Sequence, residues 1–179
     1  MAIRTVRTIG DEVLRKKCKE VKLMTPSLKQ LIGDLFDTMR EEDGVGLAAP
    51  QVGILRRICV VDTGEESFVL VNPVIVETSG EQEGQEGCLS VPGKFGIIKR
   101  PDYVKVKALD ENMNERFVEG EALTARAICH EMEHLDGILY VDHTDQIYSV
   151  GDKVPGFDDS EDDEEAEDPD DVNDMEEND

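Results

Sequence analysis

The chain has 179 residues, of which 39% are hydrophobic, and a formal net charge of −23. This length suits one domain with a core of its own, and no apolar run approaches the roughly 18 residues that cross a bilayer. Four scattered cysteines and the lack of a signal-peptide core exclude a secreted disulfide scaffold and favour a reducing, cytoplasmic setting.

The negative charge is concentrated at the C-terminus. Residues 157–179 hold 15 Asp and Glu and no Lys or Arg, which leaves a net charge of −8 on residues 1–156. We expect residues 1–156 to form the folded domain and residues 157–179 an acidic disordered tail, because the tail has few apolar residues and many like charges. The tail is then either a solubilising extension or a docking strip for a basic partner.

Two helices are predicted near the N-terminus. Residues 11–21 carry apolar side chains at helical spacing, and a better marked helix begins at Pro26. Thr25 suits the N-cap, proline suits the first turn, and Gly44 can end the helix in a left-handed turn. The apolar stripe of this second helix consists of Leu28, Leu31, Ile32, Leu35 and Met39.

Strands are predicted in the middle of the chain. After the glycine-rich loop GVGLAAPQVG, residues 44–53, β-branched or alternating runs cover residues 54–62, 67–72 and 74–77. A loop rich in Gly and Glu follows at 79–87, and residues 103–109 and 115–119 indicate a hairpin. A last helix is expected from about Glu121 to Asp136, with Gly137 as its stop. Strands in the middle and helices at the ends predict an α+β domain.

The last predicted helix contains HEMEH, residues 130–134. Residues four apart share one helix face, so His130 and His134 can hold one metal ion with Glu131 beside it. A catalytic zinc-type centre has three protein ligands and one open position. The third ligand could be a cysteine, His143 or a carboxylate; Cys88 stands out because the irregular backbone of EGCLSVPG can aim its side chain at a helix.

Three segments occur together in this chain: GVGLAAPQVG at 44–53, EGCLS at 86–90 and HEMEHLDG at 130–137. In this order and spacing the chain resembles peptide deformylase, the metal hydrolase that removes the formyl group from the N-terminal formyl-methionine of new bacterial or organellar proteins. The resemblance runs from about Ile3 to Asp142. It implies that residues 1–156 are a catalytic domain with antiparallel and mixed β-sheets around a central C-terminal HExxH helix.

The resemblance implies a role for each residue of the reacting centre. Cys88, His130 and His134 are the implied metal ligands, and Glu131 is the implied general acid and base. Gln51 and the backbone N–H of Leu89 are the implied donors to the substrate's carbonyl oxygen. Two preset donors of this kind each lower a reaction barrier by roughly 3 kcal/mol.

The implied substrate-binding residues are Gly44, Val45, Gly46, Gly87 and Arg126. The glycines at 44 and 46 let the backbone approach an extended peptide closely. Arg126 lies one helical turn before His130, where we expect it to line the pocket for the methionine side chain or for the next residue. By resemblance alone, Arg100 and Glu42 form a structural ion pair behind the site.

The resemblance also implies a cofactor and partners. The cofactor is one divalent metal ion, Fe²⁺ in the cell, with Zn²⁺ or Ni²⁺ as replacements. The implied partners are N-formylmethionyl nascent peptides in protein biosynthesis, with a transient ribosome association. The acidic tail departs from the family, whose C-terminal helix is often basic, so we expect that the tail does not contact ribosomal RNA, because phosphates repel it. We expect no binding to DNA or to a membrane.

Two other functions fit parts of the sequence. One is a zinc peptidase of the HExxH type, although its third ligand would be expected downstream as His or Glu, not upstream as Cys88. The other is a non-catalytic acidic binding protein with a structural metal, whose site would be closed by four protein ligands.

Cys129 stands where deformylases usually have glutamine, and we interpret it as an apolar filler.

Overall fold

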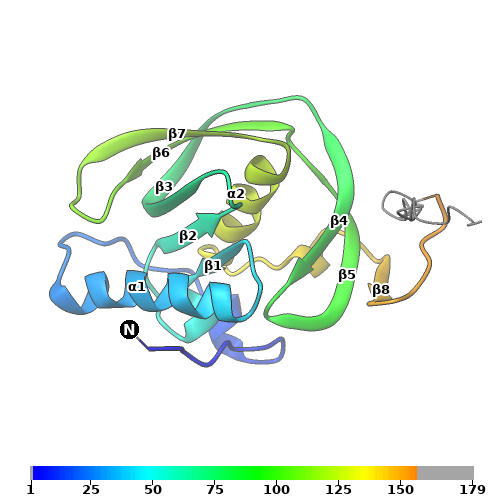
Figure 1. Cartoon of the computed structure of the whole chain (residues 1–179), viewed down its shortest axis with the longest axis horizontal. Helices are drawn as coiled ribbons and strands as arrows, with labels where there is room; N and C mark the ends of the chain where they lie inside the picture. The colour runs from blue at the N-terminus through cyan, green and yellow to red at the C-terminus, as the bar shows by residue number, and fades with distance from the viewer. Residues whose placement is uncertain (1, 157–179) are drawn as a thin grey trace, which may run out of the picture.

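Two antiparallel sheets and a helical layer surround one buried helix (Figure 1). The structure is a computed structural model that describes residues 2–156; the predicted acidic tail, residues 157–179, lies outside the described residues. No helix in the described part is long and apolar enough to cross a bilayer. The elements are η1 (Glu12–Arg15), α1 (Pro26–Glu41), β1 (Gly46–Ala48), η2 (Ala49–Val52), β2 (Ile58–Asp62), β3 (Ser67–Ser79), β4 (Gln82–Cys88), β5 (Val91–Arg100), β6 (Tyr103–Leu109), β7 (Glu115–Glu121), α2 (Ala122–His134), η3 (Tyr140–Asp142) and β8 (Ile147–Ser149).

The larger sheet has the strand order β1-β2-β3-β6-β7, and the smaller one has the order β4-β5-β8. Every strand pair in the described residues is antiparallel, and parallel pairing occurs at the isolated bridge between Lys19 and Arg56. The fold class is α+β, as predicted, with the HEMEH helix between the two sheets.

Within the larger sheet, strand β2 and the first half of β3 are buried on both faces. Side chains alternate along a strand, so Ile58 and Val60 pack with the apolar stripe of α1, whereas Cys59 and Val61 pack with α2. The fully buried strand β2 therefore fixes the two helices on opposite faces of one sheet.

The helix predictions near the motifs are confirmed, with small differences at the ends. Thr25 caps α1 by accepting a hydrogen bond from the N–H of Leu28, and Pro26 occupies the first turn. The left-handed residue after α1 is Asp43, with φ 54°, and not Gly44 as predicted. Helix α2 ends at His134, and Gly137, with φ 76°, stops it as expected.

The predicted helix over residues 11–21 is wrong beyond the short helix η1. The chain becomes extended at Lys16 because its backbone finds partners elsewhere: the N–H of Cys18 donates to the carbonyl of Leu135, and Lys19 bridges to Arg56. Tertiary contacts outweigh helical spacing in this segment.

The strand predictions are correct for the hairpin β6–β7 but incomplete elsewhere. The predicted loop at 79–87 is largely β4, which pairs with the unpredicted β5 although Gly and Glu are poor strand formers. The runs at 67–72 and 74–77 form one strand, β3, that stays continuous through a register shift after Val71. Strand β2 begins at Ile58, four residues later than predicted, and β1 and β8 were not predicted.

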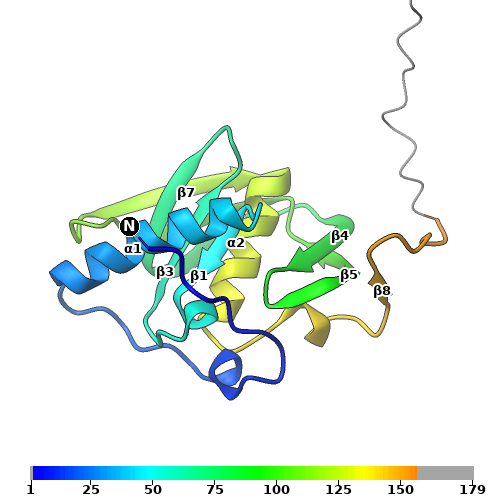
Figure 2. The ribbon, with the colours of Figure 1, turned by 60° about the horizontal axis from the view of Figure 1, so that its bottom comes forward.

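The N-terminal segment, residues 2–9, links elements that are distant in sequence (Figure 2). It first lies along α1, where the N–H groups of Ala2 and Arg4 donate to the side chains of Asp34 and Thr38. The N–H of Arg7 then donates to the carbonyl of Gln51, and the N–H of Ile9 donates to the carbonyl of Ser90, each over 2.7 Å. The segment therefore connects η2 with the turn that follows Cys88.

We predict opposite stability effects for two Gly→Ala substitutions. At Gly137, where φ is 76°, a Cβ would lie 2.5 Å from the carbonyl oxygen of Arg15, so Gly137→Ala should lower the free energy of unfolding by about 2 kcal/mol or more. At Gly33, inside α1, a Cβ meets nothing within 4 Å, so Gly33→Ala should raise it by about 0.5–1 kcal/mol. Urea unfolding measures both; a Gly137→Ala protein as stable as the parent would contradict the first expectation.

Candidate active site

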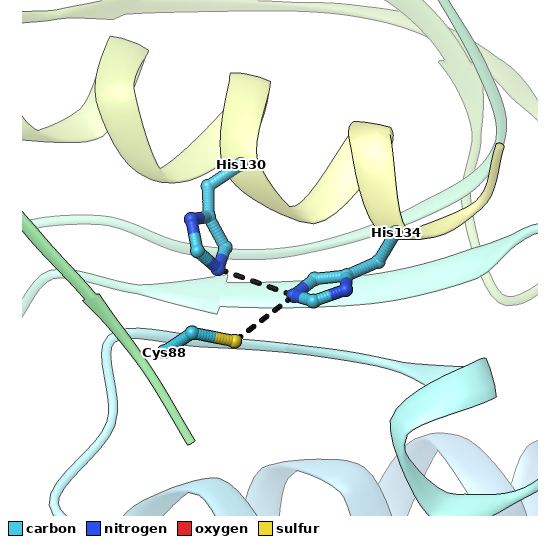
Figure 3. A group of neighbouring side chains, drawn as sticks. All are labelled: Cys88, His130 and His134. Atoms are coloured by element: carbon cyan, nitrogen blue, oxygen red, sulfur yellow. Dashed lines mark hydrogen bonds between the residues drawn. The ribbon is translucent and has the colours of Figure 1, made fainter. Parts of the chain in front are cut away.

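Cys88, His130 and His134 converge from two elements (Figure 3). Cys88 is the last residue of β4, and the two histidines project from one face of α2. The distance between Cys88 Sγ and His134 Nε2 is 3.3 Å, and that between the two histidine Nε2 atoms is 3.1 Å. All three atoms lie within 4.8 Å of one another.

This cluster fits a single divalent metal ion. Ligand nitrogens about 2.1 Å from a tetrahedral ion are about 3.3 Å apart, close to the observed separation of the histidine nitrogens. Burial holds the pKa of His134 well below its usual range, which favours the neutral imidazole that ligation needs. His143, the other candidate for third ligand, instead contacts both carboxylate oxygens of Glu133 at 2.9 Å.

His130 is oriented by a buried carboxylate on β4. Glu86 Oε1 accepts a hydrogen bond from His130 Nδ1 over 2.6 Å, and this bond leaves the Nε2 lone pair facing Cys88 and His134. Burial opposes ionisation of Glu86, but the hydrogen bonds from His130 and Arg100 outweigh it and hold the pKa of this carboxyl well below its usual range. Glu86 is therefore an anion in the folded protein.

Arg100 does not pair with Glu42, as the resemblance had implied. Its guanidinium donates two hydrogen bonds to Glu86 and a third, over 2.7 Å, to Glu133 on α2. The arginine therefore connects β5 with β4 and with α2. The implied pair is wrong because the guanidinium is already engaged by Glu86 and Glu133.

Glu131 is 4% exposed and faces β1. Burial raises the pKa of Glu131 to about 7, against the opposing effect of His130, and this value suits a group that both accepts and releases a proton. A Cβ on Gly46 would lie 2.5 Å from Glu131 Oε1. The absence of a side chain at Gly46 therefore leaves room for this carboxylate. The sequence alone did not reveal this reason for a glycine at position 46.

Gln51 on η2 is held in one orientation. Its Oε1 accepts a hydrogen bond from the N–H of Ala48 over 2.9 Å, so its Nε2 points toward Ser90 Oγ at 3.1 Å and Cys88 Sγ at 3.6 Å. Leu89 follows Cys88 directly in the turn between β4 and β5. The amide of Gln51 and the backbone of Leu89 thus lie beside the same cysteine.

A pocket of about 240 Å³ opens next to His130 and Glu131. Of the predicted site residues, it is lined by Gly44, Val45, Gly46, Gly87, Leu89, Arg126, His130 and Glu131. The other three, Gln51, Cys88 and His134, adjoin it through their contacts with one another and with His130. The structure therefore brings all the predicted site residues into one region.

The sequence interpretation missed five residues that line the pocket: Asp43, Gln85, Glu86, Leu123 and Ala127. Glu86 stands two residues before Cys88, so strand alternation could have placed both side chains on one face. Leu123 and Ala127 precede His130 at helical spacing and share its face of α2.

Comparison with known proteins gives a consistent result. A family model described as polypeptide deformylase matches residues 3–149. The chain is 59% identical over 142 residues to a peptide deformylase of Agathobacter rectalis, covering 79% of this chain and 90% of that protein. It is 56% identical to peptide deformylase 1 of Clostridium acetobutylicum, covering 79% and 95%.

Solved structures agree with the sequence comparison. A peptide deformylase from Legionella pneumophila superposes with a TM-score of 0.77 at 46% identity, covering 80% of this chain and 86% of that chain. One from Synechococcus elongatus in complex with actinonin gives a TM-score of 0.76 at 42% identity, covering 79% and 78%.

The geometry predicts that metal binding depends on Cys88. Protein prepared without oxygen and loaded with Fe²⁺ or Zn²⁺ should hold one ion per chain, whereas Cys88→Ala should lose most of it because two imidazoles remain. Elemental analysis after gel filtration measures the stoichiometry. Cys18→Ala, which removes a buried thiol that does not belong to the ligand cluster, is the matched control. Full metal content in Cys88→Ala would require a different third ligand.

Proposed function

The chain belongs to the peptide deformylase family, and from this premise we propose the part that each site residue takes in the reaction. It is a metal-dependent hydrolase that removes the formyl group from the N-terminus of newly made polypeptides and releases formate. The observation that carries the assignment of roles is the convergence of one thiol and two imidazoles beside a buried carboxylate and a pocket.

Cys88, His130 and His134 hold the metal ion. When bound, a divalent metal lowers the pKa of water toward about 7 and polarises a carbonyl oxygen. We propose Fe²⁺ as the ion in the cell, with Zn²⁺ or Ni²⁺ as replacements, because thiolate and imidazole ligands suit all three. Measuring activity of the same preparation loaded with each ion tests this choice.

Glu131 moves the protons of the reaction. Its carboxylate accepts a proton from the attacking water and later delivers it to the amine nitrogen as the bond between the formyl carbon and that nitrogen breaks. The burial of Glu131 and its pKa near neutrality support both steps. The products are formate and a free N-terminal amine.

Gln51 Nε2 and the N–H of Leu89 donate hydrogen bonds to the formyl oxygen as negative charge develops on it. The support for Gln51 is its fixed orientation, since Oε1 is already engaged by Ala48. A donor that is held in place before the reaction costs no reorganisation during it.

The pocket receives the methionine side chain of the substrate. Its apolar lining includes Val45, Leu89 and Leu123, and its volume of about 240 Å³ suits one extended side chain. Gly44 and Gly87 lie at the same opening, where the lack of side chains lets a peptide backbone approach. Arg126 lines the pocket as well, with its guanidinium bonded to protein groups.

The two other candidate functions are less well supported. A zinc peptidase of the HExxH type would not explain the 59% identity to a peptide deformylase. A closed structural metal site would need a fourth protein ligand, and the cluster of His, Cys, Asp and Glu found in residues 2–156 has three members.

We propose that residues 1–156 are the catalytic domain and that the protein works in the cytoplasm. We also propose that it associates transiently with ribosomes, without contact between residues 157–179 and RNA. Fifteen acidic residues in that segment repel phosphates. Ribosome co-sedimentation of the full chain and of a chain ending at Pro155 should therefore be equal. Weaker binding of the shortened chain would show that the tail takes part.

Glu131→Gln should keep the metal and lower turnover about 10²–10⁴-fold, since an amide cannot transfer the protons. Formate release from formyl-Met-Ala measures activity, and elemental analysis measures the metal. Gly46→Ala should lower turnover too, because its Cβ displaces the same carboxylate; Gly33→Ala is the matched control with an equal change in size. A Glu131→Gln protein as active as the parent would exclude this residue as the proton carrier.

A further inference from the structure

Glu86 makes four hydrogen bonds with three side chains, one on β5 and two on α2. Its Oε1 accepts from His130 Nδ1 and from Arg100 Nη2, each over 2.6 Å. Its Oε2 accepts from Arg126 Nη1 over 2.9 Å and from Arg100 Nε over 3.0 Å. Glu86 is 5% exposed, and each oxygen already has two donors, so its acceptor capacity is filled. Its position is fixed from several directions.

One of these donors is a metal ligand, and another lines the substrate pocket. Through His130, Glu86 fixes the imidazole tautomer that presents Nε2 to the metal. Through Arg126, it reaches a residue that lines the pocket beside Leu123 and Ala127. The same carboxylate therefore contacts both functional parts of the site.

Without a partner, Arg126 would place an uncompensated charge beside the apolar side chains Val45, Leu89 and Leu123 of the pocket. Its Nη1 and Nη2 each donate to the carbonyl of Ile98 over 3.1 Å, and Nη1 donates to Glu86. The carbonyl is neutral, so the charge of Arg126 is compensated by Glu86. Within the described residues, Glu86 is the acid that forms an ion pair with this arginine.

We propose that Glu86 is a positioning residue with two separable effects: it orients His130 for metal binding, and it neutralises Arg126 so that the pocket prefers an uncharged side chain. The second effect makes Arg126 a specificity-determining residue whose influence depends on Glu86. This inference rests on the proposed function for the substrate pocket, but the metal-binding effect does not depend on it.

Glu86→Gln separates the two effects. The amide is a weaker acceptor for His130 Nδ1, so the affinity for Zn²⁺, measured by competition with a chelator, should fall about 10–100-fold. The charge of Arg126 is then uncompensated, so the ratio of kcat/KM for formyl-Met-Ala to that for formyl-Glu-Ala should fall at least tenfold. The ratio for formyl-Met-Ala to formyl-Gln-Ala should change much less, which distinguishes charge from a general loosening of the pocket.

Arg126→Met and the double variant complete the test. Arg126→Met alone should leave Zn²⁺ affinity within about threefold of the parent. Added to Glu86→Gln, it should restore the discrimination against formyl-Glu-Ala while Zn²⁺ affinity stays low. The double variant also removes the unpaired buried charge, so it keeps the metal measurement available if Glu86→Gln alone does not fold.

Asp34→Asn is the matched control, since Asp34 is a buried acid on α1 that is paired with Arg4 and does not line the pocket. It should change neither Zn²⁺ affinity nor the substrate ratios.

Zn²⁺ affinity within twofold of the parent in both Glu86→Gln and the double variant would overturn the first effect. An unchanged Met-to-Glu ratio in Glu86→Gln, or no recovery in the double variant, would overturn the second. No formate release by the parent would overturn the proposed function, and the Zn²⁺ measurement would still decide the first effect.

Discussion

Helix α2 brings ionisable side chains into the interior, and the structure around it has to compensate for their burial. Arg126, His130, Glu131 and His134 are all buried on this one helix. A buried charge is tolerated when it is paired and hydrogen-bonded, and otherwise it costs several kcal/mol. The small sheet meets this requirement for Arg126 and His130 through Glu86 on β4 and the carbonyl of Ile98 on β5, so charge pairing as well as apolar contact holds it beside α2.

The larger sheet contributes a different kind of support. Its strand β2 is buried on both faces, with α1 on one side and α2 on the other. Strand β1 pairs with β2 and places Gly46 against Glu131, and the short helix η2 that follows carries Gln51. Glu131 and Gln51 are thus positioned by the larger sheet, whereas Cys88 comes from the smaller one. The candidate site lies where the two sheets meet.

Local signals in the sequence were sufficient for the helices that carry functional residues or support them. The cap at Thr25, the stop at Gly137 and the spacing of His130 and His134 each act within a few residues, and each has the expected structure. The residues of the candidate site could be named because three separate segments resembled one family.

Pairings between distant segments were not predictable in the same way. Strand β4 has the composition of a loop and is a strand because β5 pairs with it. The partner of Arg100 and the reason for glycine at 46 depend on residues 14 and 85 positions away. The predicted helix after Asp11 failed for a related cause, since Cys18 bonds to the end of α2. Periodicity describes a segment by itself and does not report which neighbours it will meet.

Contacts between segments that are distant in sequence affect how the protein is synthesised and folded. Arg7 and Ile9 bond to the backbone at Gln51 and Ser90, and Cys88 meets a histidine 46 residues further along the chain. Contacts of such long range form after the loops between them have closed, which makes folding slow relative to a helical bundle. In a growing chain the cluster of Cys88, His130 and His134 is incomplete until His134 has been added. A chain whose synthesis stops before that residue cannot assemble the cluster, whereas a chain that has passed it can.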